Sequence, residues 1–162
     1  MKEYTQEELN SLISCPKIII EPPKKEMKLE RGHLRNQIKL RSKEGEYDFD
    51  VFMRILEAFQ ENFSVGLVYK PKDEPGSFVL FRCNGPHGPF TEISGELTSH
   101  FKFHIHRAKK ENIEQGLLPE KGGDHTETYA SYLQALSYFL KAVNVINADE
   151  YFPDIQLPLG LN

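Results

Sequence analysis

The segment His100–Arg107 alternates polar and apolar residues without interruption, and it constrains the fold more than any other stretch. Successive side chains of a β-strand point to opposite faces, so this pattern predicts a half-buried strand. Three apolar side chains would enter the core and four polar ones would line the other face: Phe101, Phe103 and Ile105, against His100, Lys102, His104 and His106. Three imidazoles on one face make this strand the first candidate for a functional site.

Six short β-rich runs are separated by turn-forming residues along the chain. Alternating apolar side chains, bounded by glycine, proline or charged clusters, predict a strand in each run. The predicted strands cover residues 17–21, 38–42, 47 to about 53, 64–70, 78–84 and 100–107. Short turns join several of these runs, so we expect antiparallel hairpins. For residues 54–62, continued strand and a helical apolar stripe both stay open.

Two segments begin with helix-capping signals. Thr5 followed by Glu8 is a capping box, and apolar residues at helical spacing follow it until Pro16, which predicts a short N-terminal helix. Ser131 followed by Gln134 is a second capping signal, and about three turns of apolar stripe predict a longer C-terminal helix. The sequence therefore predicts an α+β fold, in which a single antiparallel meander sheet of five or six strands carries both helices.

The length of 162 residues fits one domain, which we place at residues 1–147, followed by an irregular tail at 148–162. No apolar run approaches the roughly 20 residues that a membrane span needs, and the first residues do not resemble a signal peptide. Cys15 and Cys83 have no partner motif, which suits a reducing compartment. We therefore expect a cytoplasmic protein with no membrane partner.

Charge is distributed unevenly along the chain. Residues 16–43 contain nine Lys and Arg against three acidic residues, a local charge of +6, whereas the whole chain has a net charge of −4. Such a basic segment could face the phosphates of RNA or a nucleotide, or the acidic surface of a partner protein. The alternative is a solvated edge hairpin, because lysines are common on strand edges that must not aggregate.

His104 and His106 would lie on one strand face, about 6.6 Å apart, so they can converge on one ion or one phosphate. As a His-x-His pair they could bind a divalent metal, with zinc as the first candidate. A third ligand would come from one of four residues: His87, His100, Glu111 or His125. Three protein ligands are typical of an open catalytic zinc site.

The same imidazoles could instead act without a metal. One histidine would serve as general base and another as general acid, since imidazole titrates near neutral pH. Lys102 or Arg82 would then stabilise the charge of a pentavalent phosphate. Arg107 and Lys109 are further candidates for phosphate binding. The residues alone do not decide between metal ligation and acid–base chemistry.

His87 lies in a compact turn, residues 82–89, directly after an apolar predicted strand. Glycines on both sides of this turn let a ligand approach closely, and loops held by a rigid strand often carry function. A plain turn with an exposed histidine is the alternative. His125, just ahead of the C-terminal helix, would be either a lid residue or part of a polar turn. We assign no catalytic role to His33.

These motifs together resemble an uncharacterised family of small bacterial proteins. The resemblance rests on residues 63–69, the Asn-Gly-x-His-Gly turn at 84–88, the His-x-His strand at 104–106 and the helix that follows 128–132. It covers most of the chain and departs most in the lysine-rich region 24–43. The family is a domain of unknown function, so the resemblance implies a shared fold and marks His87, His104 and His106 without naming a reaction.

The sequence thus leads to one functional hypothesis and two alternatives. The first is a small phosphodiester-cleaving enzyme, ribonuclease-like and toxin-type by analogy with small histidine-bearing proteins of toxin–antitoxin or phage-defence loci. The second is a binding module that holds a nucleotide, a nucleic acid or a partner protein without chemistry. The third is a structural metal site, in which His87, His104 and His106 bind zinc and fix the loop.

Overall fold

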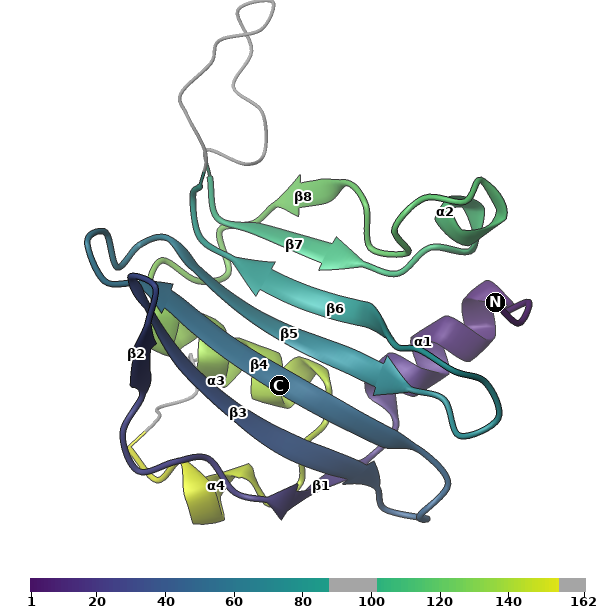
Figure 1. The fold of residues 1–162 in the computed structure, drawn as a ribbon, viewed down its shortest axis with the longest axis horizontal. Helices are drawn as coiled ribbons and strands as arrows, with labels where there is room; N and C mark the ends of the chain where they lie inside the picture. Colours follow the sequence, from purple (N-terminus) through teal and green to yellow (C-terminus); the bar gives the residue numbers. More distant parts are fainter. Residues whose placement is uncertain (88–101, 155–162) are drawn as a thin grey trace, which may run out of the picture.

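The computed structural model of the protein describes residues 1–87 and 102–154, in which one antiparallel β-sheet is covered by helices on one face (Figure 1). The strands are β1 (Lys17–Glu21), β2 (Lys28–Glu30), β3 (His33–Ser42), β4 (Asp48–Leu56), β5 (Phe63–Lys70), β6 (Phe78–Asn84), β7 (His104–Arg107) and β8 (Gly123–His125). The helices are α1 (Gln6–Ser14), α2 (Lys110–Glu114), α3 (Tyr132–Ala142) and α4 (Ala148–Tyr151).

The strands follow the order β1-β3-β4-β5-β6-β7-β8, and β2 also pairs with β3. All pairs of strands are antiparallel. The predicted α+β class with an antiparallel sheet is confirmed, but five or six strands is wrong, because the sheet has eight. The two additional strands, β2 and β8, are three residues long. Strands this short offer no alternation of buried and exposed residues, so the sequence pattern resembled loops.

Both predicted helices begin at the predicted caps. The Thr5 side chain accepts a hydrogen bond from the Glu8 amide, and the Glu8 carboxylate accepts one from the Thr5 amide. Ser131 accepts a hydrogen bond from the amide of Gln134 at the start of α3. These bonds satisfy amide groups that a helix start leaves without an intrahelical partner. The two helices lie behind the sheet in the view of Figure 1.

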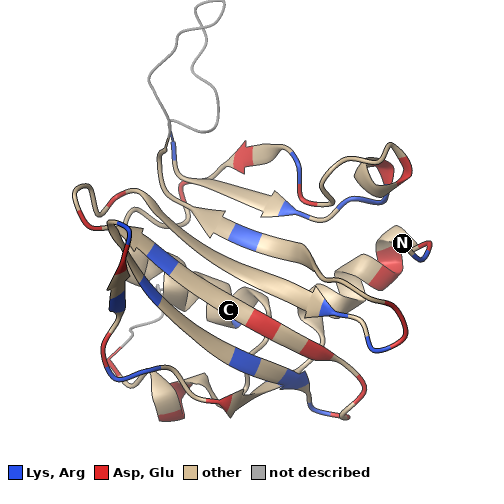
Figure 2. Ribbon diagram, viewed as in Figure 1, with Lys and Arg blue, Asp and Glu red and all other residues tan. Residues whose placement is uncertain are grey.

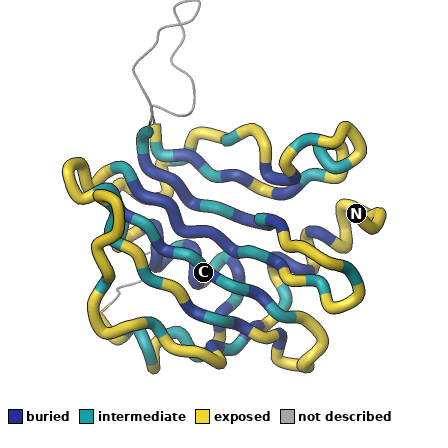
Figure 3. Tube along the Cα trace, viewed as in Figure 1, coloured by how far each residue is buried: buried dark blue, intermediate teal, exposed yellow. Residues whose placement is uncertain are grey.

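Strand β4 shows how the sheet separates its two faces. Its residues alternate between buried and half-buried over the whole strand, and Phe49, Val51 and Met53 enter the core between sheet and helices (Figure 3). The strand continues to Leu56, which resolves the open segment 54–62 in favour of strand for its first residues. The half-buried residues of β4 point to the opposite face, which we call the front face because it is turned toward the viewer in Figure 1.

The segment 148–162, predicted to be irregular, begins with the short helix α4. Three of its side chains, Ala148, Tyr151 and Phe152, pack partly buried against the core. Residues 155–162 lie outside the described part of the chain. Within the described residues, no helix combines the length and apolar character that crossing a membrane requires.

Candidate functional site

The strand register brings residues of six strands, most of them polar, into two neighbouring rows on the front face. The first row contains Arg35, Arg54, Ser64, Asn84, His104 and His125, and the second contains Gln37, Phe52, Gly66, Arg82, His106 and Gly123. Residues paired across adjacent strands lie about 5 Å apart and share a face. The two rows, which we call the site end, therefore share one face of the sheet from β3 to β8.

The histidines of β7 are buried although they belong to the front face. His104 is 0% exposed and His106 is 3% exposed. Their ring centroids are 4.9 Å apart, and the His87 ring is 5.0 Å from that of His104. The Nε2 atoms of His87 and His104 are 3.3 Å apart. The structure thus brings together His87, His104 and His106, the three histidines that the sequence singled out.

Backbone carbonyls fix the orientation of both β7 imidazoles. The Nδ1 atom of His104 is 2.7 Å from the Lys102 carbonyl oxygen, and that of His106 is 3.0 Å from the Glu120 carbonyl oxygen. A carbonyl only accepts, so Nδ1 carries the proton in each ring. In the neutral form the lone pair is then on Nε2, where it can accept a proton.

The short contact between His87 and His104 holds one proton. Since His104 already donates through Nδ1, a hydrogen bond between the two Nε2 atoms needs a proton on one of them and a lone pair on the other. Two imidazolium rings would place N–H groups against each other. When one of the two rings carries an additional proton as an imidazolium, the pair can donate that proton as a general acid.

Two glycines make room for this arrangement. A Cβ atom on Gly123 would lie 2.8 Å from Cδ2 of His104 and 3.1 Å from Nε2 of His106, so a side chain there would displace the imidazoles. A Cβ atom on Gly85 would collide with the carbonyl oxygen of Glu61. Glycine at these positions lets β8 and the turn before His87 approach the site closely.

The backbone beneath His104 is held from the core side. The Tyr129 hydroxyl, which is buried, lies 2.8 Å from the carbonyl oxygen of His104 and 3.0 Å from that of Asn84. On the front face Ser64 donates a 2.9 Å hydrogen bond to the Asn84 side chain. These contacts link β5, β6 and β7 at the first row and make the histidines part of a rigid sheet.

Comparisons with models of protein families, with curated proteins and with solved structures found no similarity that meets the threshold for a match. The resemblance to an uncharacterised bacterial family therefore stays a prediction.

Three arginines from three strands extend the site beside the histidines. Arg35 and Arg54 are paired directly across β3 and β4, and Arg82 lies next to His106 in the second row. Burial, together with the positive charges of Arg35 and Arg82, lowers the pKa of Arg54. Burial also lowers the pKa of Arg82, against the influence of Glu120. The positive charges of Arg35 and Arg82 therefore disfavour the charged form of Arg54.

These arginines line a front-face pocket of about 460 Å³. The other lining residues come from β2 to β4 and the loop before β2: Lys24, Lys28, Glu30, Asn36, Gln37, Phe52 and Met53. Among the described residues neither Arg54 nor Arg82 forms an ion pair, and the buried Nε of Arg82 has no hydrogen-bond partner. Excess positive charge in a concave pocket suits an anion.

Not every residue predicted from the sequence lies here. Arg107 stacks on the Phe81 ring, 4.7 Å from its centroid, and Phe81 belongs to the core between sheet and helices. Lys109 precedes α2, and Glu111 lies within that helix, beyond the end of β7 (Figure 1). Lys102 contributes its carbonyl to His104. The structure therefore brings Arg82, but not Arg107, to the face of the histidines.

The structure does not confirm the predicted places of the remaining candidate histidines, His125 and His100. His125 is paired with His104 across β7 and β8, so it belongs to a strand and not to the turn that we predicted. Residues 109–124, between the predicted histidine strand and the C-terminal helix, contain α2 and the start of β8. His100 lies outside the described residues. Within residues 1–87 and 102–154, no three His, Cys, Asp or Glu side chains are arranged to hold a metal ion.

The sequence did not reveal several residues of the site. Arg35 was predicted only as part of a basic segment, and Arg54 lay in a stretch of undecided structure. Glu120 is 5% exposed and supplies the carbonyl that orients His106. Only Gly122-Gly123 carried a signal, because paired glycines often mark close backbone approach. The arginine cluster depends on strand register, which short-range patterns do not determine.

Proposed function

We propose that this protein cleaves phosphodiester bonds in the manner of a ribonuclease, using the histidines of the site end. The observation that supports this most is the 3.3 Å contact between Nε2 of His87 and Nε2 of His104, with His104 Nδ1 held by a carbonyl. When one ring of such a pair is protonated as an imidazolium, the pair can deliver that proton to a leaving group. A second imidazole, His106, lies beside it with its Nδ1 similarly held.

The roles follow from these proton positions. His106 Nε2 removes the proton of a ribose 2′-hydroxyl, whose oxygen attacks phosphorus as the bond to the 5′-oxygen breaks. The His87–His104 pair supplies the proton that the departing 5′-oxygen takes up. The products are a 2′,3′-cyclic phosphate and a 5′-hydroxyl. Arg82, the row neighbour of His106, stabilises the additional negative charge on the non-bridging oxygens of the pentavalent phosphate.

The test is cleavage of a labelled single-stranded RNA by untagged protein in the presence of EDTA. We expect wild type to form a 2′,3′-cyclic phosphate end and His104→Gln to lose at least about a hundredfold in rate. His33→Gln is the matched control, because His33 begins β3 at the margin of the sheet and outside the two rows. Equal cleavage by wild type and His104→Gln would attribute the activity to a contaminant and refute the proposal.

A bound metal is a second candidate for the same histidines. Metal-binding histidines commonly donate their other ring nitrogen to a backbone carbonyl, as His104 and His106 do here. Elemental analysis of untagged protein separates the alternatives: one equivalent of zinc that is lost in His104→Gln would support a metal site. Cleavage that persists in EDTA would support acid–base chemistry.

We further propose that the protein works in the cytoplasm. Both cysteines are thiols in the structure, and the Cys83 thiol is buried, where burial raises its pKa. A buried thiol of raised pKa is poorly reactive and needs no oxidising compartment. Isolation of active protein from a reducing cell extract, with both thiols titratable after unfolding, would support this location. An intermolecular or internal disulfide in the native protein would contradict it.

A further inference from the structure

Arg35 and Arg54 form a pair that the fold itself does not favour. They face each other directly across β3 and β4, and like charges in that position are destabilising. Only Arg35 has an acidic partner among the described residues, and its Nε is 4.0 Å from a Glu30 carboxylate oxygen. A cost without a structural gain is typical of a site that binds a ligand, because natural sequences break local rules mainly at functional sites.

The pocket offers more than charge. A Cβ atom on Gly66 would collide with the Phe52 ring, so this aromatic ring lies directly over the backbone of β5. Phe52 is half-buried and lines the pocket together with Arg54 and Arg82. An aromatic face beside guanidinium groups is the combination that binds single-stranded nucleic acid, where bases stack and phosphates pair with cations.

The dimensions indicate a ligand longer than one nucleotide. Arg35 lies on β3 and His104 on β7, four strand spacings apart, which corresponds to about 19 Å across the sheet. Arg82 occupies the intermediate strand β6 and belongs both to the pocket and to the row of His106. A ligand that reached both the histidines and Arg35 would therefore have to present phosphates at several positions along its length.

We propose that the pocket of Arg35, Arg54, Arg82 and Phe52 is a subsite for single-stranded RNA, which binds the chain next to the phosphate at the histidines. This inference rests on the proposed function and names its substrate class. Arg54 and Arg35 bind a flanking phosphate, and Phe52 stacks on a flanking base. Lys24 and Lys28, from the basic segment 16–43, form the outer wall of the same pocket.

The experiment measures binding of a fluorescent ten-nucleotide RNA in the His104→Gln background, so that no RNA is cut. Arg54→Met should weaken binding at least about tenfold, because charge-assisted contacts are the strong ones. The slope of log affinity against log salt should fall by about 0.7 for the lost contact. Phe52→Leu retains apolar volume and should weaken binding at least about fivefold through lost stacking.

Lys70→Met is the matched control, because Lys70 lies on the front face of β5 and pairs with Asp50. It should bind RNA as the parent does. Equal binding by Arg54→Met and Lys70→Met, or equal affinity for duplex and single strand, would overturn the subsite. Arg54-dependent binding without any cleavage by the wild-type histidines would refute the proposed function and leave the RNA subsite standing.

Discussion

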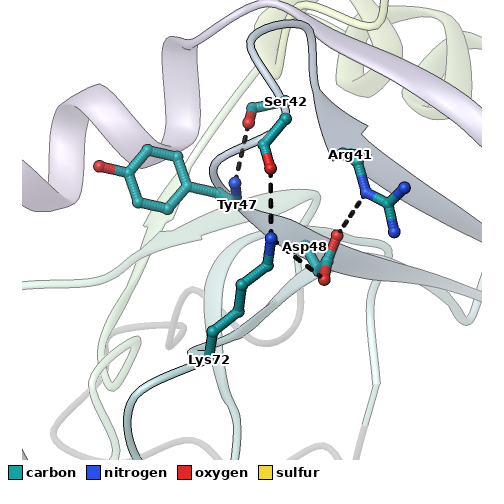
Figure 4. A network of polar contacts seen from close by, with 6 residues as sticks. Arg41, Ser42, Tyr47, Asp48 and Lys72 are labelled. Carbon is teal, nitrogen blue, oxygen red and sulfur yellow. Dashed lines mark hydrogen bonds and ion pairs between the residues drawn. The ribbon is translucent and has the colours of Figure 1, made fainter.

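The two ends of the front face differ in how charged side chains are paired across the strands. At the end near the β3–β4 turn, every arginine and lysine in register faces an aspartate or lies beside one. Arg41 pairs with Asp48 at 2.9 Å, and Lys72 approaches the same carboxylate at 3.9 Å (Figure 4). Lys70 pairs with Asp50. We call these five residues the paired end. At the site end, Arg35 faces Arg54, and Arg82 lies two strands further along the sheet.

The comparison separates stability from function. Figure 2 shows blue bands of β3 beside red bands of β4 at the paired end, and blue beside blue nearer β2. Opposite charges across strands contribute about 0.2–1 kcal/mol, and like charges cost a similar amount. Strands β3 and β4 therefore contain an opposite-charge pair at one end and a like-charge pair at the other. The register allows opposite charges to face each other, but the site end has none that do. Because the like-charge pair lowers stability at the site end, we expect a ligand to bind there and not at the paired end.

The largest expected effect comes from Gly123→Ala, which tests whether the site end needs its geometry as well as its residues. The new methyl group would displace the imidazoles of His104 and His106, and misplacement by about 1 Å can cost a hundredfold in rate. We expect about that loss in RNA cleavage with a folded protein by circular dichroism. Asp124→Ala, the exposed neighbouring residue in β8, is the control and should retain activity.

Lys17 is a buried cation whose three N–H groups all have hydrogen-bond acceptors in the described part of the chain, in contrast to Arg82 of the site end. It is 0% exposed, and Nζ donates to the carbonyls of Ile13, Cys15 and Val143. Burial lowers its pKa to about 8. The unfolded chain, with a lysine pKa near 10.4, then binds more protons than the folded one above pH 8, so stability should rise with pH.

Between pH 7.5 and 9.5 this rise should amount to about 2 kcal/mol. Chemical denaturation at a series of pH values measures it as the difference between wild type and Lys17→Met, in which other titrations cancel. Parallel pH profiles for the two proteins would show that the Lys17 ammonium keeps its ordinary pKa when buried. Lys17 would then no longer serve as a comparison for Arg82, whose buried Nε has no hydrogen-bond partner among the described residues.

Arg54→Met should stabilise the protein without ligand by about 0.5–1 kcal/mol, because it removes the like-charge pair with Arg35. Urea denaturation measures this difference. Inorganic phosphate at a few tens of millimolar should raise the melting temperature of wild type more than that of the variant. A loss of stability in Arg54→Met would mean that Arg54 is a structural residue, and the contrast between the two ends would fail.

The smallest effect is expected from Asp48→Asn at the paired end. This change removes the carboxylate charge that faces Arg41 and Lys72, both half-exposed, and should destabilise by about 0.5 kcal/mol. The sign is opposite to that of Arg54→Met on the same strand. RNA binding and cleavage should stay at wild-type levels, and any drop in either would extend the site beyond the two rows.

Elements with local signals were predictable from sequence. Capping residues placed α1 and α3, and alternation placed Phe103 and Ile105 against the core with His104 and His106 on the other face. Residues 100 and 101 of that predicted strand lie outside the described residues. The local pattern was sufficient here because side-chain period and capping act within a few residues of the chain.

The arrangement between elements was not predictable. Arg54 and Arg82 are 28 positions apart in sequence, and only the pairing of β4, β5 and β6 brings them to one face. Register of this kind depends on turn geometry and on the whole hydrophobic pattern. Arg107 shows the same limit in reverse, because its neighbour in sequence, His106, faces the other side of the sheet. Sequence proximity therefore suggested a phosphate ligand that the register directs elsewhere.

The two rows of the site end have a consequence for biosynthesis. Their residues span Arg35 to His125 and are joined only through strands β3 to β8, in a sheet that grows by addition at one edge. The residues of the arginine pocket are translated before β7 and β8, whereas α3, which packs on β5 and β6, follows later. The histidines are oriented only after Glu120 and Gly123 have been translated. An incomplete polypeptide thus contains the arginines of the pocket without the contacts that orient the imidazoles.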